Sequence, residues 1–244
     1  MSLVKTFYDI LPFNKSDDNS LWKQINKSNT PWKSLDTAVS NSNTVLELGC
    51  GQGWLSNRIA NNYSVEVTGI DLIKENIDRA KGYNIPNASF NQEDILQTTR
   101  TADTVVSIGV LHHIPDHDIS FLLEQAILKS NQYCFMGLYH TSSRRAMFDF
   151  YDKYPEHKQY KLFKKMTPWI KDETQRKSWF RDQLRHPYEV TIDLSVLQAA
   201  ALSTGRKLTW CNFDNDEQYD ITMSKLKSYE FIPGFVYAMF EEEK

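Results

Sequence analysis

Three glycines at alternate positions follow a short apolar run near the start of this 244-residue chain. The run reads Val-Leu-Glu-Leu-Gly-Cys-Gly-Gln-Gly over residues 45–53, and a helical pattern begins at Trp54. Glycine lets the backbone turn sharply and leaves no Cβ in the way of a ligand. The free amides at the start of the helix can then face that ligand. We call residues 49–53 the glycine loop and expect it to join a buried strand to a helix and to bind a small molecule.

The spacing of the glycines excludes two common nucleotide-binding loops. A nicotinamide or flavin fingerprint would need its third glycine at position 54, which is Trp54, and there is no Gly-Lys-Ser/Thr of a Walker loop. Glu47, two positions before Gly49, would repel a pyrophosphate but suits a cationic group. Glu-x-Gly-x-Gly-x-Gly resembles the first motif of class I S-adenosylmethionine-dependent methyltransferases. In that family the loop wraps the methionine half of the cofactor, which carries an ammonium and a sulfonium.

Further motifs of this family follow in order. Residues 64–72 alternate apolar and polar side chains, which predicts a second strand with Asp71 at its tip. An acid at this place can accept hydrogen bonds from both ribose hydroxyls. A short strand within residues 88–95 ends at Asp94 and Ile95, which the resemblance places at the adenine amino group and beside the adenine ring. Residues 102–111 form a continuous, β-branched strand of the kind that parallel sheets bury, and residues 132–140 form a fifth strand.

The resemblance implies an α/β fold: a Rossmann-like, seven-stranded, mostly parallel sheet with an antiparallel last strand. We expect one domain with four parts. Residues 1–43 contribute to an active-site cover, residues 44–140 form the cofactor-binding half, residues 141–190 insert a helical lid after strand five, and residues 191–244 complete the fold.

The last part carries clear element signals. Asp193 is the expected N-cap of a helix over residues 194–203, and Gly205 is its C-cap. Residues 207–212 are the expected sixth strand, and residues 231–240, around Pro233 and Gly234, the closing strand.

The implied cofactor is S-adenosylmethionine, and the resemblance places it against residues at the strand ends. These residues are Glu47, Gly49, Gly51, Gln52, Gly53, Asp71, Leu72, Asp94, Ile95, Ile108, Gly109 and Leu111.

The amino-acid composition indicates the broad class of protein. Hydrophobic residues make up 41% and charged residues 24% of the chain, as in an ordinary globular protein. Cys50, Cys134 and Cys211 lie far apart, which is typical of reduced, buried cysteines. No run has transmembrane length, and the N-terminus has no signal-peptide core. We therefore expect a cytoplasmic protein without a membrane partner; its oligomeric state is not indicated.

The expected lid is basic and aromatic. Residues 141–190 hold twelve Lys/Arg and seven Asp/Glu, so the lid carries a net charge of +5 within a chain of net charge −3. Such a cover suits an anionic small-molecule substrate, although a solvated helical face would show the same charges. The candidate substrate residues are Arg144, Arg145, Arg181 and Arg185.

Several segments narrow the resemblance to the bacterial type-11 and type-12 small-molecule methyltransferases. They are Phe-Tyr-Asp-Ile-Leu-Pro-Phe over residues 7–13, Gly-Val-Leu-His-His over 109–113, Gly-Leu-Tyr-His over 137–140, Trp-Phe-Arg-Asp-Gln over 179–183 and His-Pro-Tyr-Glu over 186–189. This group implies methyl transfer to a hydroxyl or carboxyl oxygen but does not define the acceptor.

A hydroxyl acceptor needs a base, and His113 is the first candidate, because the resemblance places a histidine after strand four close to the acceptor. His112 is expected to point the other way, whereas His140 and Tyr139, at the tip of strand five, are expected to face the same cleft. Alternatively, the two histidines form a packed turn bonded to backbone. Asp182 and His186 could support the base or form a helix-surface pair.

Other functions fit less well. A nucleic-acid base methyltransferase would carry Asp/Asn-Pro-Pro-Tyr/Phe after strand four, which is absent, so nucleic acid is not an expected partner; the basic lid keeps RNA as an alternative. A non-catalytic partner protein or an aminopropyl transferase are further alternatives, disfavoured by the intact motifs and by Glu47. Although His113 and His117 have zinc-ligand spacing, Pro115 opposes the helix they would need, and we expect no metal site.

Overall fold

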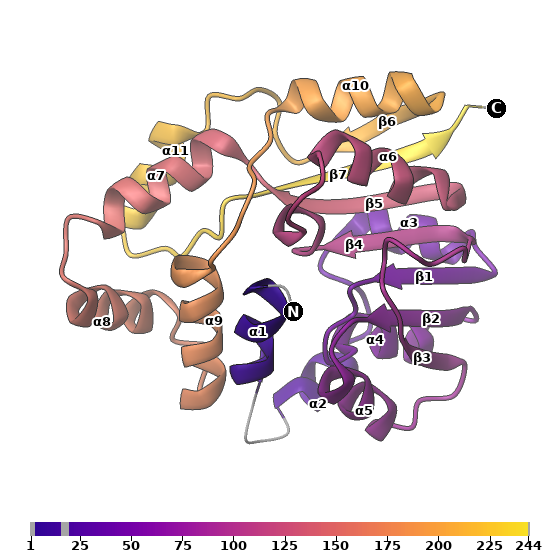
Figure 1. Ribbon diagram of the computed structural model, residues 1–244, viewed down its shortest axis with the longest axis horizontal. Coiled ribbons are helices and arrows are strands. Elements are labelled where there is room, and N and C mark those ends of the chain that lie inside the picture. Colours follow the sequence, from indigo (N-terminus) through magenta and orange to yellow (C-terminus); the bar gives the residue numbers. More distant parts are fainter. Residues whose placement is uncertain (1–2, 16–19, 244) are drawn as a thin grey trace.

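A computed structural model describes residues 3–15 and 20–243 of the chain. Its centre is a seven-stranded sheet in the order β3-β2-β1-β4-β5-β7-β6, with helices on both faces (Figure 1). The strands are β1 (Thr44–Leu48), β2 (Glu66–Asp71), β3 (Ala88–Gln92), β4 (Ala102–Ile108), β5 (Ser130–Tyr139), β6 (Arg206–Cys211) and β7 (Phe235–Glu242). β7 runs antiparallel to both β5 and β6, whereas β1–β5 are parallel. The expected fold class is confirmed.

The two faces of the sheet are covered by different helices. One face packs against α3 (Lys33–Ser40), α4 (Trp54–Asn62) and α5 (Lys74–Gly82). The other packs against α6 (Ile119–Leu128) and α10 (Leu194–Thr204), which also contact each other. Because helices cover both faces, the central strands β1 and β4 are buried over almost their whole length, as is typical of parallel strands.

A second group of helices lies beyond the carboxyl ends of the parallel strands (Figure 1). It consists of α7 (Thr141–Tyr151), α8 (Glu156–Met166), α9 (Glu173–Arg185) and α11 (Tyr219–Lys227), which share their own apolar cluster. We call these four helices the helical cap. The short helix α1 (Leu3–Ile10) lies between α9 and the sheet, whereas α2 (Ser20–Ile25) packs on α4.

The chain leaves and re-enters the sheet at the cap. β5 runs directly into α7, and after α9 the Val190 amide donates to the carbonyl of His112, at 2.9 Å. His112 belongs to the 3₁₀ turn η1 (Leu111–His113), which follows β4. The far end of the predicted lid therefore contacts the turn that carries the candidate base.

Two local expectations need correction. Pro233 and Gly234 precede the closing strand instead of lying within it, because Gly234 adopts a φ of 74° and its carbonyl accepts the His140 amide before pairing with β5 begins. Asp193 occupies the N-cap position of α10, but its side chain makes no capping bond; the Leu194 amide donates to Asp216 instead. Gly205 is the left-handed C-cap as expected.

Two further features concern the cysteines and the helix lengths. Cys50, Cys134 and Cys211 are free thiols, and the first two are buried. Among the described residues, no helix has the length and apolarity needed to cross a membrane.

The middle of the sheet predicts a sharp response to one added methyl group. A Cβ on Gly137 of β5 would lie 2.9 Å from the Tyr237 ring and 3.0 Å from Ile108 Cγ2. We expect Gly137→Ala to lower the free energy of unfolding by about 1–3 kcal/mol through overpacking, measured by urea denaturation. Gly82→Ala is the matched control, because nothing lies within 4 Å of its added Cβ. Equal stability of the two variants would contradict this packing.

Candidate functional site

The glycine loop joins β1 to α4 in the way its spacing predicts. Gly49, Gly51 and Gly53 have φ values of 78°, 51° and 74°, a region that favours glycine. A Cβ on Gly49 would lie 2.5 Å from a methyl group of Val110, and one on Gly53 would lie 2.6 Å from the Cβ of Ala80. The loop therefore contacts the segment that leads from β4 into His112 and His113.

Glu47 lies buried on β1, directly behind the loop. One of its carboxylate oxygens accepts hydrogen bonds from the amide of Ser56, at 3.0 Å, and from the Ser56 hydroxyl. Burial raises the pKa of Glu47 to about 8, despite these two hydrogen bonds. A cationic group beside this carboxylate would favour its charged form.

Asp71 ends β2 and contacts the glycine loop from the other side. Its Oδ2 accepts the Gly51 amide at 2.9 Å, and its Oδ1 accepts the Ile73 amide at 2.8 Å. Burial raises the pKa of Asp71, whereas these hydrogen bonds oppose the rise. Oδ1 also accepts the Asn76 side-chain amide at 3.2 Å, so Oδ2 is the carboxylate oxygen that keeps a lone pair free for a ribose hydroxyl group.

The other expected cofactor residues differ in accessibility. Asp94 and Ile95 are half-buried after β3, and the Asp94 carboxylate accepts the Leu96 amide at 2.9 Å. Leu72 is exposed, and Ile108 and Gly109 are half-buried at the end of β4. Leu111 belongs to the core of the sheet and offers no surface to a ligand. Gln52 is buried, and its side-chain amide donates to the Phe13 carbonyl at 3.3 Å. The N-terminal segment therefore lies against the glycine loop.

The two candidate histidines lie in one aromatic cluster. The rings of His112 and Tyr139 have centroids 4.1 Å apart, and His113 meets Tyr139 edge to face at 5.5 Å. His112 therefore does not point away from His113 as expected, since the 3₁₀ turn η1 places both rings against Tyr139. Within residues 3–15 and 20–243, neither His112 ring nitrogen has a hydrogen-bond partner, and burial lowers the pKa of His112 well below its usual value.

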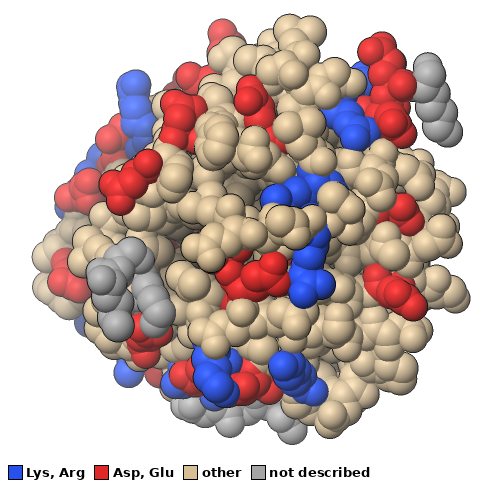
Figure 2. Space-filling model, turned by 45° about the vertical axis from the view of Figure 1, so that its right-hand side comes forward, with Lys and Arg blue, Asp and Glu red and all other residues tan. Residues whose placement is uncertain are grey.

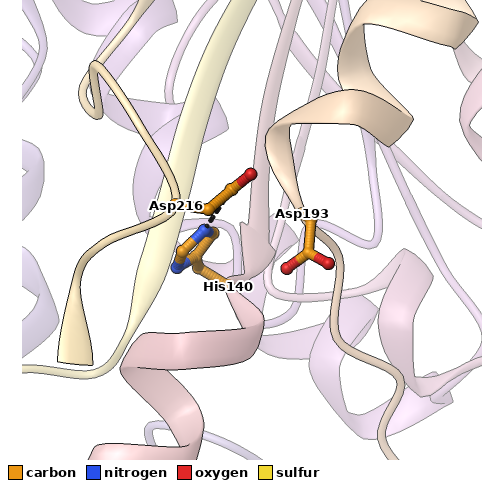
Figure 3. Close-up of side chains that lie close together, drawn as sticks. All are labelled: His140, Asp193 and Asp216. Carbon is orange, nitrogen blue, oxygen red and sulfur yellow. Dashed lines mark hydrogen bonds and ion pairs between the residues drawn. The ribbon is translucent and has the colours of Figure 1, made fainter.

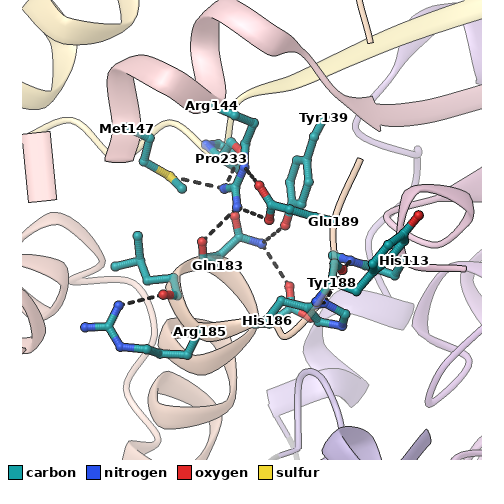
Figure 4. Close-up of polar contacts among 12 residues, drawn as sticks. His113, Tyr139, Arg144, Met147, Gln183, Arg185, His186, Tyr188, Glu189 and Pro233 are labelled. Atoms are coloured by element: carbon teal, nitrogen blue, oxygen red, sulfur yellow. Dashed lines mark hydrogen bonds and ion pairs between the residues drawn. The ribbon is translucent and has the colours of Figure 1, made fainter. Parts of the chain in front are cut away.

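His113 has a different environment (Figure 4). Its Nδ1 lies 2.9 Å from the Tyr188 carbonyl, and its ring stacks on His186 with centroids 3.6 Å apart. A carbonyl only accepts, so Nδ1 carries the proton and Nε2 keeps a lone pair. That Nε2 is buried and has no partner among the described residues. Burial, followed by repulsion from His186, lowers the pKa of His113 well below its usual value.

His140 does not belong to the aromatic cluster of His112, His113 and Tyr139. Successive strand residues point to opposite faces, so Tyr139 and His140 diverge at the tip of β5. His140 is fully buried, and its Nε2 lies 2.8 Å from Asp216 Oδ1 (Figure 3). The ligand atoms of His140, Asp193 and Asp216 lie within 4.8 Å of one another. The contact between His140 and Asp216 links β5 to the loop before α11.

A chain of hydrogen bonds runs from α1 through α9 to β5. The Tyr8 hydroxyl donates to Asp182 at 2.7 Å, while the Gln183 amide donates to Asp182 at 3.0 Å and to the Tyr139 hydroxyl at 2.9 Å. Burial raises the pKa of Asp182 to about 6. Sequence reasoning gave no role to Tyr8 or Gln183, although both lie in segments 7–13 and 179–183 that carry the family resemblance.

The four candidate substrate arginines have four different environments. Arg144 is fully buried and paired with Glu189, so its donors are not free for a substrate. Arg145 is 74% exposed on the outside of α7, beside Asp149. Arg185 contacts Gln159 and points away from His113 (Figure 4). Only Arg181 lies toward α1, with its guanidinium 4.0 Å from the Phe7 ring centroid and with no acidic partner among the described residues.

The remaining surface charges are mixed. On the face shown in Figure 2, lysine and arginine side chains alternate with acids around a hollow and form no continuous basic surface. Several lid cations are paired, including Lys164 and Arg176, which both contact Glu173. These pairs join residues of the lid to one another, so residues 141–190 still carry their net charge of +5.

A family model described as "Methyltransferase domain" matches residues 40–183, more than half of the chain. The curated 2-methyl-6-phytyl-1,4-hydroquinone methyltransferase of Synechocystis sp. is 33% identical over 90 residues, which cover 35% of this chain. The matched part spans only 28% of that relative.

Solved structures agree on the fold. Magnesium protoporphyrin IX methyltransferase from Synechocystis PCC 6803, crystallised with S-adenosylhomocysteine, superposes with a TM-score of 0.55 at 13% identity, covering 98% of this chain and 92% of its own. The plantazolicin methyltransferase superposes with a TM-score of 0.52 at 15% identity, and the match covers 99% of this chain and 94% of that protein. A methyltransferase from Mesorhizobium loti superposes with a TM-score of 0.54 at 13% identity, and the match covers 84% of this chain and 93% of that protein. The family match, the strand order and the glycine loop show that this chain belongs to the class I S-adenosylmethionine-dependent methyltransferase family.

Proposed function

We propose that this chain transfers a methyl group from S-adenosylmethionine to an oxygen of a small anionic acceptor, with His113 as general base. The observation that carries the proposal is the state of His113. Its Nδ1 is held by the Tyr188 carbonyl, and its buried Nε2 has no partner among the described residues. A neutral imidazole with a free, buried nitrogen can accept a proton as an acceptor oxygen is methylated.

The residues around the glycine loop fit the cofactor. Glu47 would face its ammonium group and Asp71 its ribose, whereas the half-buried Asp94 and Ile95 would lie beside the adenine. When bound, the cofactor would supply the methyl group of its sulfonium. The rest of the cofactor would be the leaving group, a neutral thioether. Because Gly49 lies against Val110, three residues before His113, the loop and the base belong to one site.

The protein's main task in such a reaction is alignment. An acceptor hydroxyl placed against His113 would form its new C–O bond while its proton passes to Nε2. His113 then holds that proton as imidazolium until solvent removes it. A carboxylate acceptor would need no base, so the effect of replacing His113 separates these two acceptor classes.

Arg181 supports an anionic acceptor. It is the candidate arginine that lies beside α1, and its buried Nη1 has no hydrogen-bond partner in the described part of the chain. Burial lowers the pKa of Arg181, so an anion beside it would relieve the cost of its charge. The name of the curated relative, a hydroquinone methyltransferase, supports a small molecule over RNA as the acceptor class.

Cofactor binding should depend on pH through Glu47. Its pKa of about 8 means that it is largely protonated at pH 7, and a neighbouring ammonium favours the carboxylate. Binding therefore releases a proton, and affinity rises as pH increases toward 8. Titration calorimetry of S-adenosylhomocysteine in two buffers of different ionisation enthalpy measures this proton. Glu47→Gln should abolish the release, and an equal release by that variant would contradict the assignment.

Turnover should depend on His113 more than cofactor binding does. Screening metabolite fractions with methyl-labelled cofactor would first identify an acceptor. His113→Ala should then reduce turnover by roughly 10²–10⁴-fold and leave cofactor affinity almost unchanged, because the side chain acts on the acceptor's proton. His157→Ala, at an exposed histidine of α8, is the matched control. Full turnover by His113→Ala would remove this residue from the mechanism.

Acceptor affinity should depend on Arg181. Arg181→Met keeps much of the side-chain volume but removes a charged hydrogen-bond donor worth about 1.5–3 kcal/mol. We expect the Michaelis constant for the acceptor to rise about tenfold or more, measured by initial rates. Arg145→Met, at the exposed position on α7, should leave that constant unchanged. A similar response from both variants would refute a specific role for Arg181.

A further inference from the structure

We propose that His186 is a positioning residue for His113: it shares the Tyr188 carbonyl with His113 and keeps that ring neutral, with Nε2 free to accept a proton. The proposal rests on the proposed function, because it concerns the base of that reaction. It adds a second histidine, from a distant part of the chain, to the site.

The geometry of the pair carries the proposal (Figure 4). His186 is the C-cap of α9, and its Nδ1 lies 2.5 Å from the Tyr188 carbonyl, the same oxygen that His113 Nδ1 meets at 2.9 Å. The Tyr188 amide also lies 3.2 Å from His186 Nδ1, but the shorter contact, to the carbonyl, requires a proton on that nitrogen. Both rings then keep a bare Nε2, and both Nε2 atoms are buried without a partner among the described residues.

The stack limits how many protons the pair can hold. With centroids 3.6 Å apart and planes inclined by 30°, two imidazolium rings would repel strongly. Burial lowers the pKa of both rings, that of His186 to about 4, and a charge on His186 further lowers the pKa of His113. We therefore expect the stacked pair to accept no more than one proton.

The stacked rings of His113 and His186 are surrounded by charged and titratable groups from several neighbouring elements. They are His112 on η1, Tyr139 on β5, Arg144 on α7, Arg181 and Asp182 on α9, and Tyr8 on α1. Both arginines disfavour a second positive charge, and the Asp182 carboxylate is occupied by Tyr8 and Gln183. His186 is thus the titratable ring in direct stacking contact with His113, and its removal isolates the effect of the pair.

Nitrogen-15 NMR of histidine-labelled full-length protein tests the proposal without any acceptor. In the wild type we expect His113 to be neutral at pH 7 with its proton on Nδ1. His186→Phe keeps an aromatic ring in the stack but removes both nitrogens. We expect the pKa of His113 to move upward in this variant, because the neighbouring charge is gone. His186→Asn, whose amide can still donate to the Tyr188 carbonyl, is a second variant and should shift that pKa in the same direction.

His157→Phe is the matched control and should leave the His113 signals unchanged. An unaltered His113 pKa in both His186 variants, or a wild-type proton on Nε2, would overturn the proposal. The same variants separate this inference from the proposed function. If the NMR shifts occur but His113→Ala retains full turnover, the pairing holds and the catalytic role of His113 fails. If His113 is required, the acid limb of the kcat–pH profile should move to higher pH in His186→Phe.

Discussion

The ion pair between Arg144 and Glu189 determines where the cap lies relative to the sheet. A buried guanidinium is costly unless it is paired and its donors are used. Arg144 meets both conditions: two of its nitrogens donate to Glu189, at 3.0 and 2.5 Å, and one also donates to the Gln183 carbonyl at 2.9 Å. Its guanidinium carbon lies 3.7 Å from the Tyr139 ring centroid. One side chain on α7 thus holds α9, the segment after it and the tip of β5.

The site follows from this pairing. Glu189 is the residue after Tyr188, so a fixed Glu189 carboxylate also fixes the carbonyl that both His113 and His186 contact. Gln183, held through its own carbonyl by Arg144, donates its side-chain amide to Tyr139 and to Asp182. The chemistry proposed at His113 therefore depends on the buried charge of Arg144, whose donors are used within the protein.

Sequence reasoning predicted the fold around the glycine loop well because its signals are local. The glycine loop, Glu47 and Asp71 each lie within a few residues of the strand that positions them, and the structure places them together at the strand ends. The cap was predicted less completely because its contacts are distant in sequence. Tyr8 meets Asp182 across 174 residues, and the key partner of His113 is a backbone carbonyl, which leaves no pattern in the side chains. Net charge likewise cannot distinguish a paired arginine such as Arg144 from Arg181, which has no acidic partner in the described part of the chain.

A crystal structure of the full chain with S-adenosylhomocysteine would test the central claim most directly, namely that the glycine loop and the cluster around His113 form one site. We expect the amino acid end to lie beside Glu47, the ribose to bind Asp71, and the sulfur to face the segment from Gly109 to His113. A ligand bound with its sulfur turned toward His140 and Asp216, or bound away from the glycine loop, would contradict the account.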